Sequence, residues 1–152
     1  MKCSTSGVIY GVCVCVCVCV CVCVCVLYGR GEETSSHHFL HCEVASLIWQ
    51  KVMLWWDFSF ITPQNLWIHW DCWGMKGYAK KVCKGLWFVW HAKIWVIWHA
   101  RNSKIYMNVT SGVVDMVEEV KVLSWRWSLT RLKIPTCMIY EWCWNLNECI
   151  RR

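Results

Sequence analysis

Acidic residues are scarce in this sequence, which has 10 aspartates and glutamates against 16 lysines and arginines. Only three of the acidic residues are aspartates, and these lie far apart, at Asp57, Asp71 and Asp115. Catalytic magnesium is usually held by carboxylates placed close together, so the sequence offers no site for two-metal polymerase or nuclease chemistry. The net charge of +6 permits contact with nucleic acid, although most basic domains of this size simply have a solvated face.

Charged and strongly polar side chains are absent between Val8 and Tyr28. As a helix, these 21 residues would span about 31 Å, which is enough for the hydrocarbon core of a bilayer. Lys2 precedes the run and Arg30 follows it, as is typical of a membrane anchor or an uncleaved signal. Alternating valines favour an extended strand instead, and a single strand cannot cross a membrane. The segment is therefore predicted to be extended or membrane-like.

Within this run, residues 12–26 are a perfect alternation of valine and cysteine that contains seven of the 14 cysteines. Neighbours two positions apart cannot all find separate disulfide partners, so a reducing intracellular compartment, cytoplasm or nucleus, is expected rather than a secreted scaffold. A GT dinucleotide repeat in the gene would encode this alternation. Residues 1–24 are accordingly predicted to be a low-complexity segment without evolved chemistry.

The rest of the chain predicts an all-α domain. Hydrophobic residues make up 57% of the sequence and tryptophan alone occurs 14 times, which excludes a disordered protein. Apolar residues recur at helical spacing within residues 37–58 and form one face. That face consists of Leu47, Ile48, Val52, Trp55 and Trp56. We expect a tryptophan-rich bundle of four or five helices.

Helix start and stop signals place a second helix over residues 63–73. Thr62 is suited to the N-cap position and Pro63 to the first helical turn. Gly74 and Gly77 follow the last apolar residue and predict the end of this helix.

The longest predicted helix covers residues 78–107 and is apolar almost all round, which is typical of the central helix of a core. A further helix over residues 112–133 is capped by Ser111 and closed by Pro135, and an aromatic tail should dock on the core. The core stripe of the central helix is expected to be Trp87, Trp90, Ile94 and Trp98. The histidines among the tryptophans are expected at helix surfaces or core edges: His69, His91 and His99.

Potential metal ligands follow the valine–cysteine repeat. His37 and Cys42 are separated by four residues, and imidazole nitrogen and thiolate sulfur are both good zinc ligands. A tetrahedral structural site needs four ligands, and the fitting upstream pair would be C-x-x-C. Cys25 holds the first position of that pair, but Tyr28 holds the second, so the sequence is one ligand short. The alternative, surface histidines with Cys42 buried at a helix start, stays open on spacing alone.

The segment VLYGRGEETSSHHFLHCEVASLIWQKV, residues 26–52, resembles the zinc-binding region of reverse transcriptases from plant LINE-type (non-LTR) retrotransposons. That family has a C-x-x-C pair, an acidic GxEET loop, the sequence HLFLHC and a tryptophan a few residues later. Cys25, His37 and Cys42 match its ligands, whereas Tyr28 replaces the second cysteine. Further along, WVIWHARNSKIYMN resembles the family's IWxIWxxRNxxIF segment. The matching residues are Ile97, Trp98, Arg101, Asn102, Ile105 and Tyr106.

The resemblance implies that residues 25–152 form a reverse transcriptase zinc-binding-like domain, with a small degenerate zinc knuckle preceding the helical bundle. It implies a non-catalytic module, a truncated copy from a longer polyprotein, because polymerase, endonuclease and RNase H motifs are absent. Zinc would be held by Cys25, His37 and Cys42, and the basic helices would bind RNA or DNA nonspecifically.

Four further possibilities remain open at this level. Cys23, His38 or His41 could replace the missing ligand, and Arg101 with Asn102 could contact a phosphate or cap the central helix. The chain could instead be a small membrane-anchored protein that uses the run from Val8 to Tyr28, or a translated remnant with no selected activity.

Overall fold

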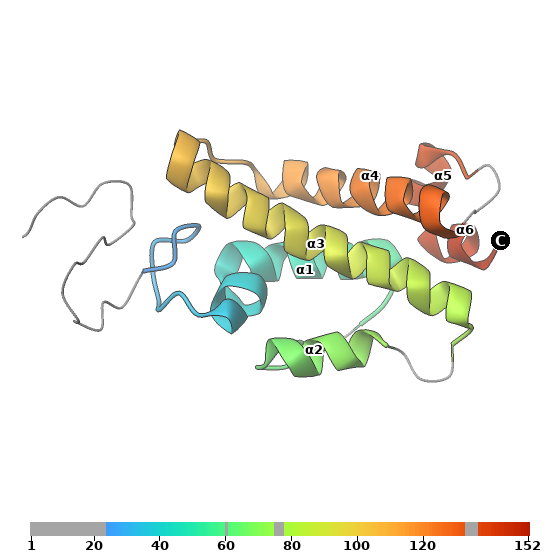
Figure 1. Cartoon of the computed structure of the whole chain (residues 1–152), viewed down its shortest axis with the longest axis horizontal. Coiled ribbons are helices and arrows are strands. Elements are labelled where there is room, and N and C mark those ends of the chain that lie inside the picture. The colour runs from blue at the N-terminus through green and yellow to red at the C-terminus, as the bar shows by residue number, and fades with distance from the viewer. Residues whose placement is uncertain (1–23, 60, 75–77, 133–136) are drawn as a thin grey trace, which may run out of the picture.

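The computed structural model describes residues 24–59, 61–74, 78–132 and 137–152. Over these residues the fold is all-α, as predicted, and the one pairing of extended backbone is an isolated antiparallel bridge between Val24 and Glu32 (Figure 1). The elements are η1 (His37–His41), α1 (Glu43–Trp56), α2 (Leu66–Trp73), α3 (Lys80–Met107), α4 (Val113–Leu132), α5 (Ile139–Trp144) and α6 (Leu146–Arg151). The described part thus holds more helices than the four or five expected, because the aromatic tail forms two short ones.

Helix α1 follows the predicted segment and buries most of the predicted face. Ile48, Val52 and Trp56 are buried, whereas Leu47 is 39% exposed. The helix ends at Asp57, which adopts the left-handed conformation (φ 55°, ψ 47°) and donates its backbone N–H to the carbonyl of Leu54. A left-handed residue terminates the helix because it turns the chain away from the helix axis.

The predicted start of α2 at Thr62 and Pro63 is wrong. The helix begins at Leu66, and Asn65 is its N-cap, with an extended backbone and a side-chain oxygen that accepts the Trp67 backbone N–H at 2.7 Å. Asparagine is at least as good a cap as threonine, so the local signals alone do not rank the two sites. The predicted end at Gly74 is confirmed, and Gly77 lies outside the described residues.

Helix α3 is the long central helix, and α4 runs antiparallel beside it (Figure 1). The predicted tryptophan stripe is only partly correct, because Trp90 is buried but Trp98 is 44% exposed. Trp87 and Ile94 are half-buried. The buried face of α3 is formed by a different set of its residues. These include Leu86, Val89, Val96, Ile97 and Ala100.

Two ionisable side chains are buried where α1, α2 and α3 meet. Lys93 is 0% exposed, and its Nζ atom lies 3.3 Å from the ring centroid of Trp49 and 4.1 Å from that of Trp73. His69 was expected at the surface or the core edge, but it is 0% exposed and its Nδ1 accepts the indole N–H of Trp90 at 3.0 Å. The other two histidines of this group are exposed, as expected: His91 and His99.

The C-terminal tail docks on the core through Trp142, which is fully buried. Its indole N–H donates to the Ser124 hydroxyl of α4 at 3.1 Å, and its backbone carbonyl accepts the indole N–H of Trp55 in α1 at 3.2 Å. The predicted docking is therefore confirmed. Helix α4 begins at Val113, two residues after the predicted cap Ser111, and Pro135 lies outside the described residues.

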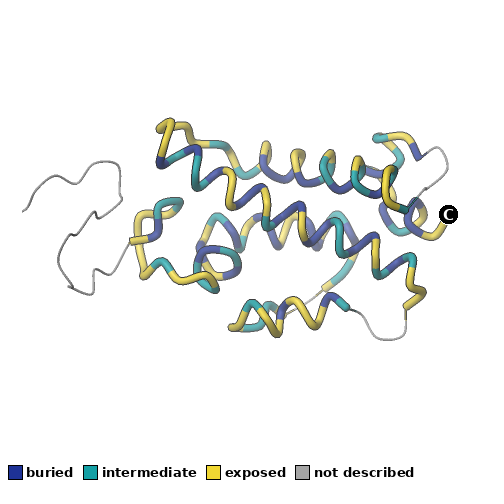
Figure 2. Tube along the Cα trace, viewed as in Figure 1, coloured by how far each residue is buried: buried dark blue, intermediate teal, exposed yellow. Residues whose placement is uncertain are grey.

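Buried residues gather on the faces of α1, α3 and α4 that are turned toward one another (Figure 2). Most of the apolar run from Val8 to Tyr28 lies outside the described residues. Within the described part, none of the helices combines the length and the apolar character that crossing a bilayer requires.

Candidate metal centre

The candidate metal centre begins with a tight loop that holds Cys25. The Gly29 N–H donates to the Cys25 carbonyl at 2.7 Å, and the Cys25 N–H donates to the Gly31 carbonyl at 3.0 Å. Gly29 and Gly31 both have φ near +78°, a conformation that side-chain-bearing residues rarely adopt. At Gly31 an added Cβ would also approach Cε1 of His37 to 3.1 Å. Gly31 therefore lets the backbone of this loop lie close to the His37 ring.

A short π-helical turn, η1, places His37 and Cys42 beside that loop. The backbone N–H of His37 donates to the Thr34 hydroxyl at 3.1 Å, and the backbone N–H of Cys42 donates to the His37 carbonyl at 2.6 Å. Cys42 ends η1 and is at the same time the N-cap residue of α1. Burial raises the pKa of the Cys42 thiol, while the backbone N–H groups of Ala45 and Val44 act in the opposite direction. The positive end of α1 thus offsets part of the cost that burial adds to a thiolate or a metal-bound sulfur at this position.

The three predicted ligands converge in space. The donor atoms of Cys25, His37 and Cys42 all lie within 4.8 Å of one another, and the two sulfurs are 3.6 Å apart. Two thiolates on one tetrahedral zinc ion lie about 3.8 Å apart, since each Zn–S bond is about 2.3 Å. Both cysteines are 0% exposed, and the buried Nε2 atom of His37 has no hydrogen-bond partner among the described residues. This group can therefore hold a metal ion.

Tyr28, in the position of the missing ligand, is 42% exposed. A hydrogen bond from its hydroxyl to the Glu43 carboxylate raises the pKa of Tyr28, with the negative charge of that carboxylate acting in the same direction. Both effects keep the phenol protonated, which disfavours a phenolate ligand. The side chain at this position is therefore directed to the first residue of α1.

The expected replacements for the missing ligand are directed elsewhere. His38 is buried, and its Nδ1 lies 3.8 Å from the Glu33 carboxylate; burial lowers its pKa to about 4. His41 is exposed, and its Nε2 lies 3.1 Å from the Gln64 carbonyl oxygen. Cys23 lies outside the described residues. The alternative of surface histidines is thus correct for His41 but wrong for His38.

An ion pair that the sequence did not reveal ties this centre to the end of α3. Both guanidinium nitrogens Nε and Nη2 of Arg101 donate to the Glu33 carboxylate, the Nη2 bond at 2.9 Å. The hydrogen bond to Arg101 lowers the pKa of Glu33, whose side chain is only 10% exposed. Arg101 was expected to contact phosphate or cap α3, but it is engaged by Glu33, and Asn108 is the C-cap. The sequence offered only an indirect signal, since Glu33 and Arg101 belong to the two segments that carry the family resemblance but nothing in either segment indicates that they pair.

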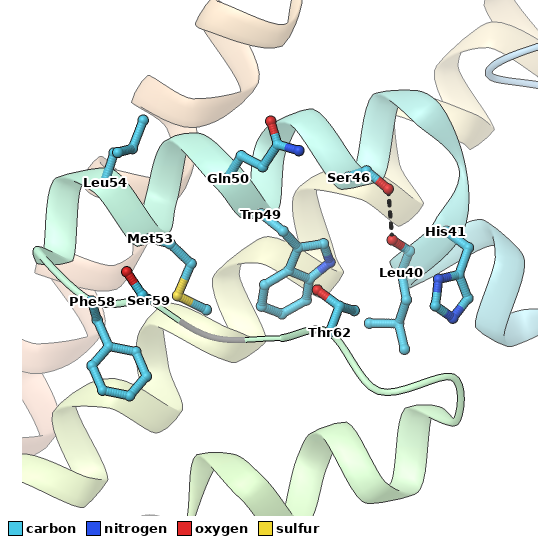
Figure 3. A pocket seen from close by; sticks show the side chains of 10 residues that line it. All are labelled: Leu40, His41, Ser46, Trp49, Gln50, Met53, Leu54, Phe58, Ser59 and Thr62. Atoms are coloured by element: carbon cyan, nitrogen blue, oxygen red, sulfur yellow. Dashed lines mark hydrogen bonds between the residues drawn. The ribbon is translucent and has the colours of Figure 1, made fainter.

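A separate open cavity of about 480 Å³ lies between α1 and the segment that follows it (Figure 3). Its lining mixes aromatic and aliphatic residues with hydroxyl and amide groups, and His41 stands at its edge beside Leu40. The Ser46 hydroxyl donates to the Leu40 carbonyl there at 3.0 Å. None of the three converging ligands lines this cavity, so it is distinct from the metal centre.

A second surface feature lies in the groove between α3 and α4. One end, with a volume of about 420 Å³, is lined by Phe88, His91, Trp127 and Arg131. A neighbouring hollow of about 310 Å³ is almost wholly apolar. It is lined by Phe39, His91, Ile94, Trp95, Trp98 and Trp127. We call these two hollows together the aromatic groove.

Comparison of the chain with protein-family models, with curated proteins and with solved structures gives no match. Any assignment of function therefore rests on the residues and their arrangement.

Proposed function

We propose that this chain is a non-catalytic, zinc-binding module that associates with nucleic acid and derives from the reverse transcriptase polyprotein of a LINE-type retrotransposon. The observation that carries the metal part is the convergence of Cys25, His37 and Cys42 within 4.8 Å. Buried sulfurs and an unpartnered buried imidazole nitrogen would be costly without an ion, and zinc accepts both donor types. With zinc bound, the ion would fasten the N-terminal loop to the start of α1.

The family part of the proposal is supported by how the two resembling segments lie in space. Glu33 belongs to the GEET stretch and Arg101 to the HARN stretch, 68 positions apart, and their side chains form one bidentate ion pair. Buried pairs of this geometry hold two elements in a fixed arrangement. Because the two segments contact each other, their joint resemblance supports the family assignment more strongly than two unconnected matches would.

Changing His37 to alanine is expected to lower the zinc affinity at least about tenfold, because one of only three protein ligands is removed. The measurement is metal content by mass spectrometry together with competition against a zinc chelator. The full chain is used with the other six repeat cysteines changed to serine, since free thiolates there would bind zinc themselves. Those positions are Cys13, Cys15, Cys17, Cys19, Cys21 and Cys23.

The matched control is His41→Ala, which removes an exposed histidine of the same segment that bonds to Gln64 instead. It should leave the zinc affinity unchanged. A parent chain that retains less than about a tenth of an equivalent of zinc, or equal losses in the two variants, would contradict the metal site.

The aromatic groove supports the nucleic-acid part. Trp95 and Trp98 are 47% and 44% exposed on α3, and Arg131 lies at the other end of the groove on α4. Exposed aromatic rings stack on unpaired bases, and nearby cations neutralise phosphates, with little dependence on sequence. The groove therefore fits single-stranded RNA or DNA.

Changing Trp98 to alanine is expected to weaken binding of a single-stranded oligonucleotide by about 5- to 150-fold, the loss of one stacked base. Fluorescence anisotropy at several salt concentrations measures this, and affinity should fall as salt rises. The control is Trp144→Ala on α5, where the ring is 90% exposed and does not line the groove. Binding that ignores salt, or equal effects of the two substitutions, would count against the nucleic-acid role.

A further inference from the structure

The candidate centre has three donors and no fourth within reach in the part of the chain described here. Among the histidines, cysteines and acidic residues described, only Cys25, His37 and Cys42 bring donor atoms within 4.8 Å of one another, and most neighbouring groups have other partners. Tyr28 bonds to Glu43, and Glu33 is held by both arms of Arg101. His41 lies against the Gln64 carbonyl, and His38, which is directed to the Glu33 side at 3.8 Å, does not belong to the converging group. A metal in this centre would therefore have three protein ligands, two sulfurs and one nitrogen.

Burial decides what could occupy a fourth position. Where zinc has only three protein ligands, a water or substrate normally completes its tetrahedron. Here both ligand cysteines are 0% exposed, and His37 Nε2 is itself shielded from solvent. A buried water would need several polar partners, and Tyr28, Glu33 and His41 already have partners of their own. The site is thus poorly suited to the fourth ligand that zinc requires.

The same donor set suits a softer ion with a lower coordination demand. Thiolate sulfur selects monovalent copper as well as zinc, imidazole binds both metals, and Cu⁺ is stable with three ligands. Two thiolates with Cu⁺ leave one excess negative charge. Cys42 is the N-cap residue of α1, so the positive end of that helix would stabilise this charge, and the guanidinium of Arg101 acts on Cys25 in the same sense.

We propose that the Cys25, His37 and Cys42 centre holds monovalent copper more tightly than zinc, as a three-coordinate site. This inference rests on the proposed metal site and names the ion that its incomplete ligand set prefers. The replacement of a fourth cysteine by Tyr28 is what sets the preference. Restoring a thiol at that position should move the preference back to zinc.

The test uses the full chain with the six repeat cysteines before Cys25 changed to serine, without oxygen, and with equal amounts of Cu⁺ and Zn²⁺. The parent is expected to retain about one copper and little zinc after desalting, and X-ray absorption should report two sulfur neighbours and one nitrogen neighbour. Tyr28→Cys is expected to raise the zinc affinity at least about tenfold. His37→Ala should lower the Cu⁺ affinity, whereas the exposed-site controls His41→Ala and Cys72→Ser should not.

Each outcome separates this inference from the proposed zinc module. Retention of zinc in preference to copper by the parent chain would overturn the inference and leave the zinc module standing. Copper held equally well after His37→Ala, with no nitrogen neighbour in the absorption spectrum, would place the ion elsewhere and also overturn it. Absence of both metals from the parent and from Tyr28→Cys would remove the metal site altogether. Circular dichroism on each variant verifies that the helices are retained.

Discussion

Changing Trp142 to alanine is expected to lower the free energy of unfolding by about 3–5 kcal/mol, the range for removing a fully buried large aromatic side chain. Trp142 is 0% exposed, and its ring lies edge-on to Trp55 of α1 with centroids 6.4 Å apart. Its indole N–H also bonds to Ser124 of α4. One side chain therefore joins α5 to both α1 and α4, and its loss leaves a cavity where three helices meet.

The same substitution two residues later provides the control. Trp144 belongs to the same short helix but is 90% exposed, so Trp144→Ala should change the stability by less than about 0.5 kcal/mol. Urea unfolding followed by circular dichroism and tryptophan fluorescence measures both variants. Equal losses in the two would show that the tail is not docked on the core through Trp142.

The sequence predicted the helices well where the apolar pattern is long. The expected helix over residues 78–107 agrees with the observed Lys80–Met107 to within two residues. A long, continuously apolar segment bounded by polar residues leaves few other places where the helix could begin or end. The face that α3 buries was harder to predict. A helix that is apolar almost all round has no dominant side, so its partners α1 and α4, not its own period, decide that Trp98 is exposed and Val96 buried.

The candidate metal centre was predictable to the extent that its ligands lie close in sequence. His37 is the first residue of the short turn η1, and Cys42 follows its last residue. Their small separation in sequence already limits the distance between the two side chains in space. The Glu33 and Arg101 pair could not be derived in that way, because it depends on how the N-terminal loop packs on the end of α3. Burial of His69 and Lys93 was also missed, since a sequence pattern normally places such side chains at the surface.

Changing Lys93 to methionine is expected to raise the free energy of unfolding at about pH 7 by about 1–4 kcal/mol, because a buried unpaired amine is replaced by an apolar chain of similar length. Lys93 is 0% exposed, and its Nζ has no hydrogen-bond partner among the described residues. The faces of Trp49 and Trp73 attract an ammonium group and offset part of its desolvation, but they do not replace lost hydrogen bonds. Methionine would keep the contacts of the side chain with both rings.

The pH dependence gives a second and more specific test of the same residue. Burial holds the pKa of Lys93 well below its ordinary value of 10.5, so the unfolded chain binds more protons than the folded one between the folded-state pKa and 10.5. Stability contributed by this position therefore falls as the pH is lowered through that window, and levels off below the folded-state pKa. The difference between Lys93→Met and the parent should accordingly be larger at about pH 7 than at about pH 9.5.

Comparing the parent with Lys93→Met cancels the titration of the cysteines, which all the chains share. Lys51→Met is the matched control, because Lys51 is exposed on α1 and the same substitution there should change stability by less than about 0.5 kcal/mol at either pH. Urea unfolding at the two pH values measures all three chains. If Lys93→Met destabilises the protein, or if its effect is the same at both pH values, the amine is stabilised in its charged form by groups other than the two indole rings. The buried position of Lys93 would then contribute to stability instead of opposing it.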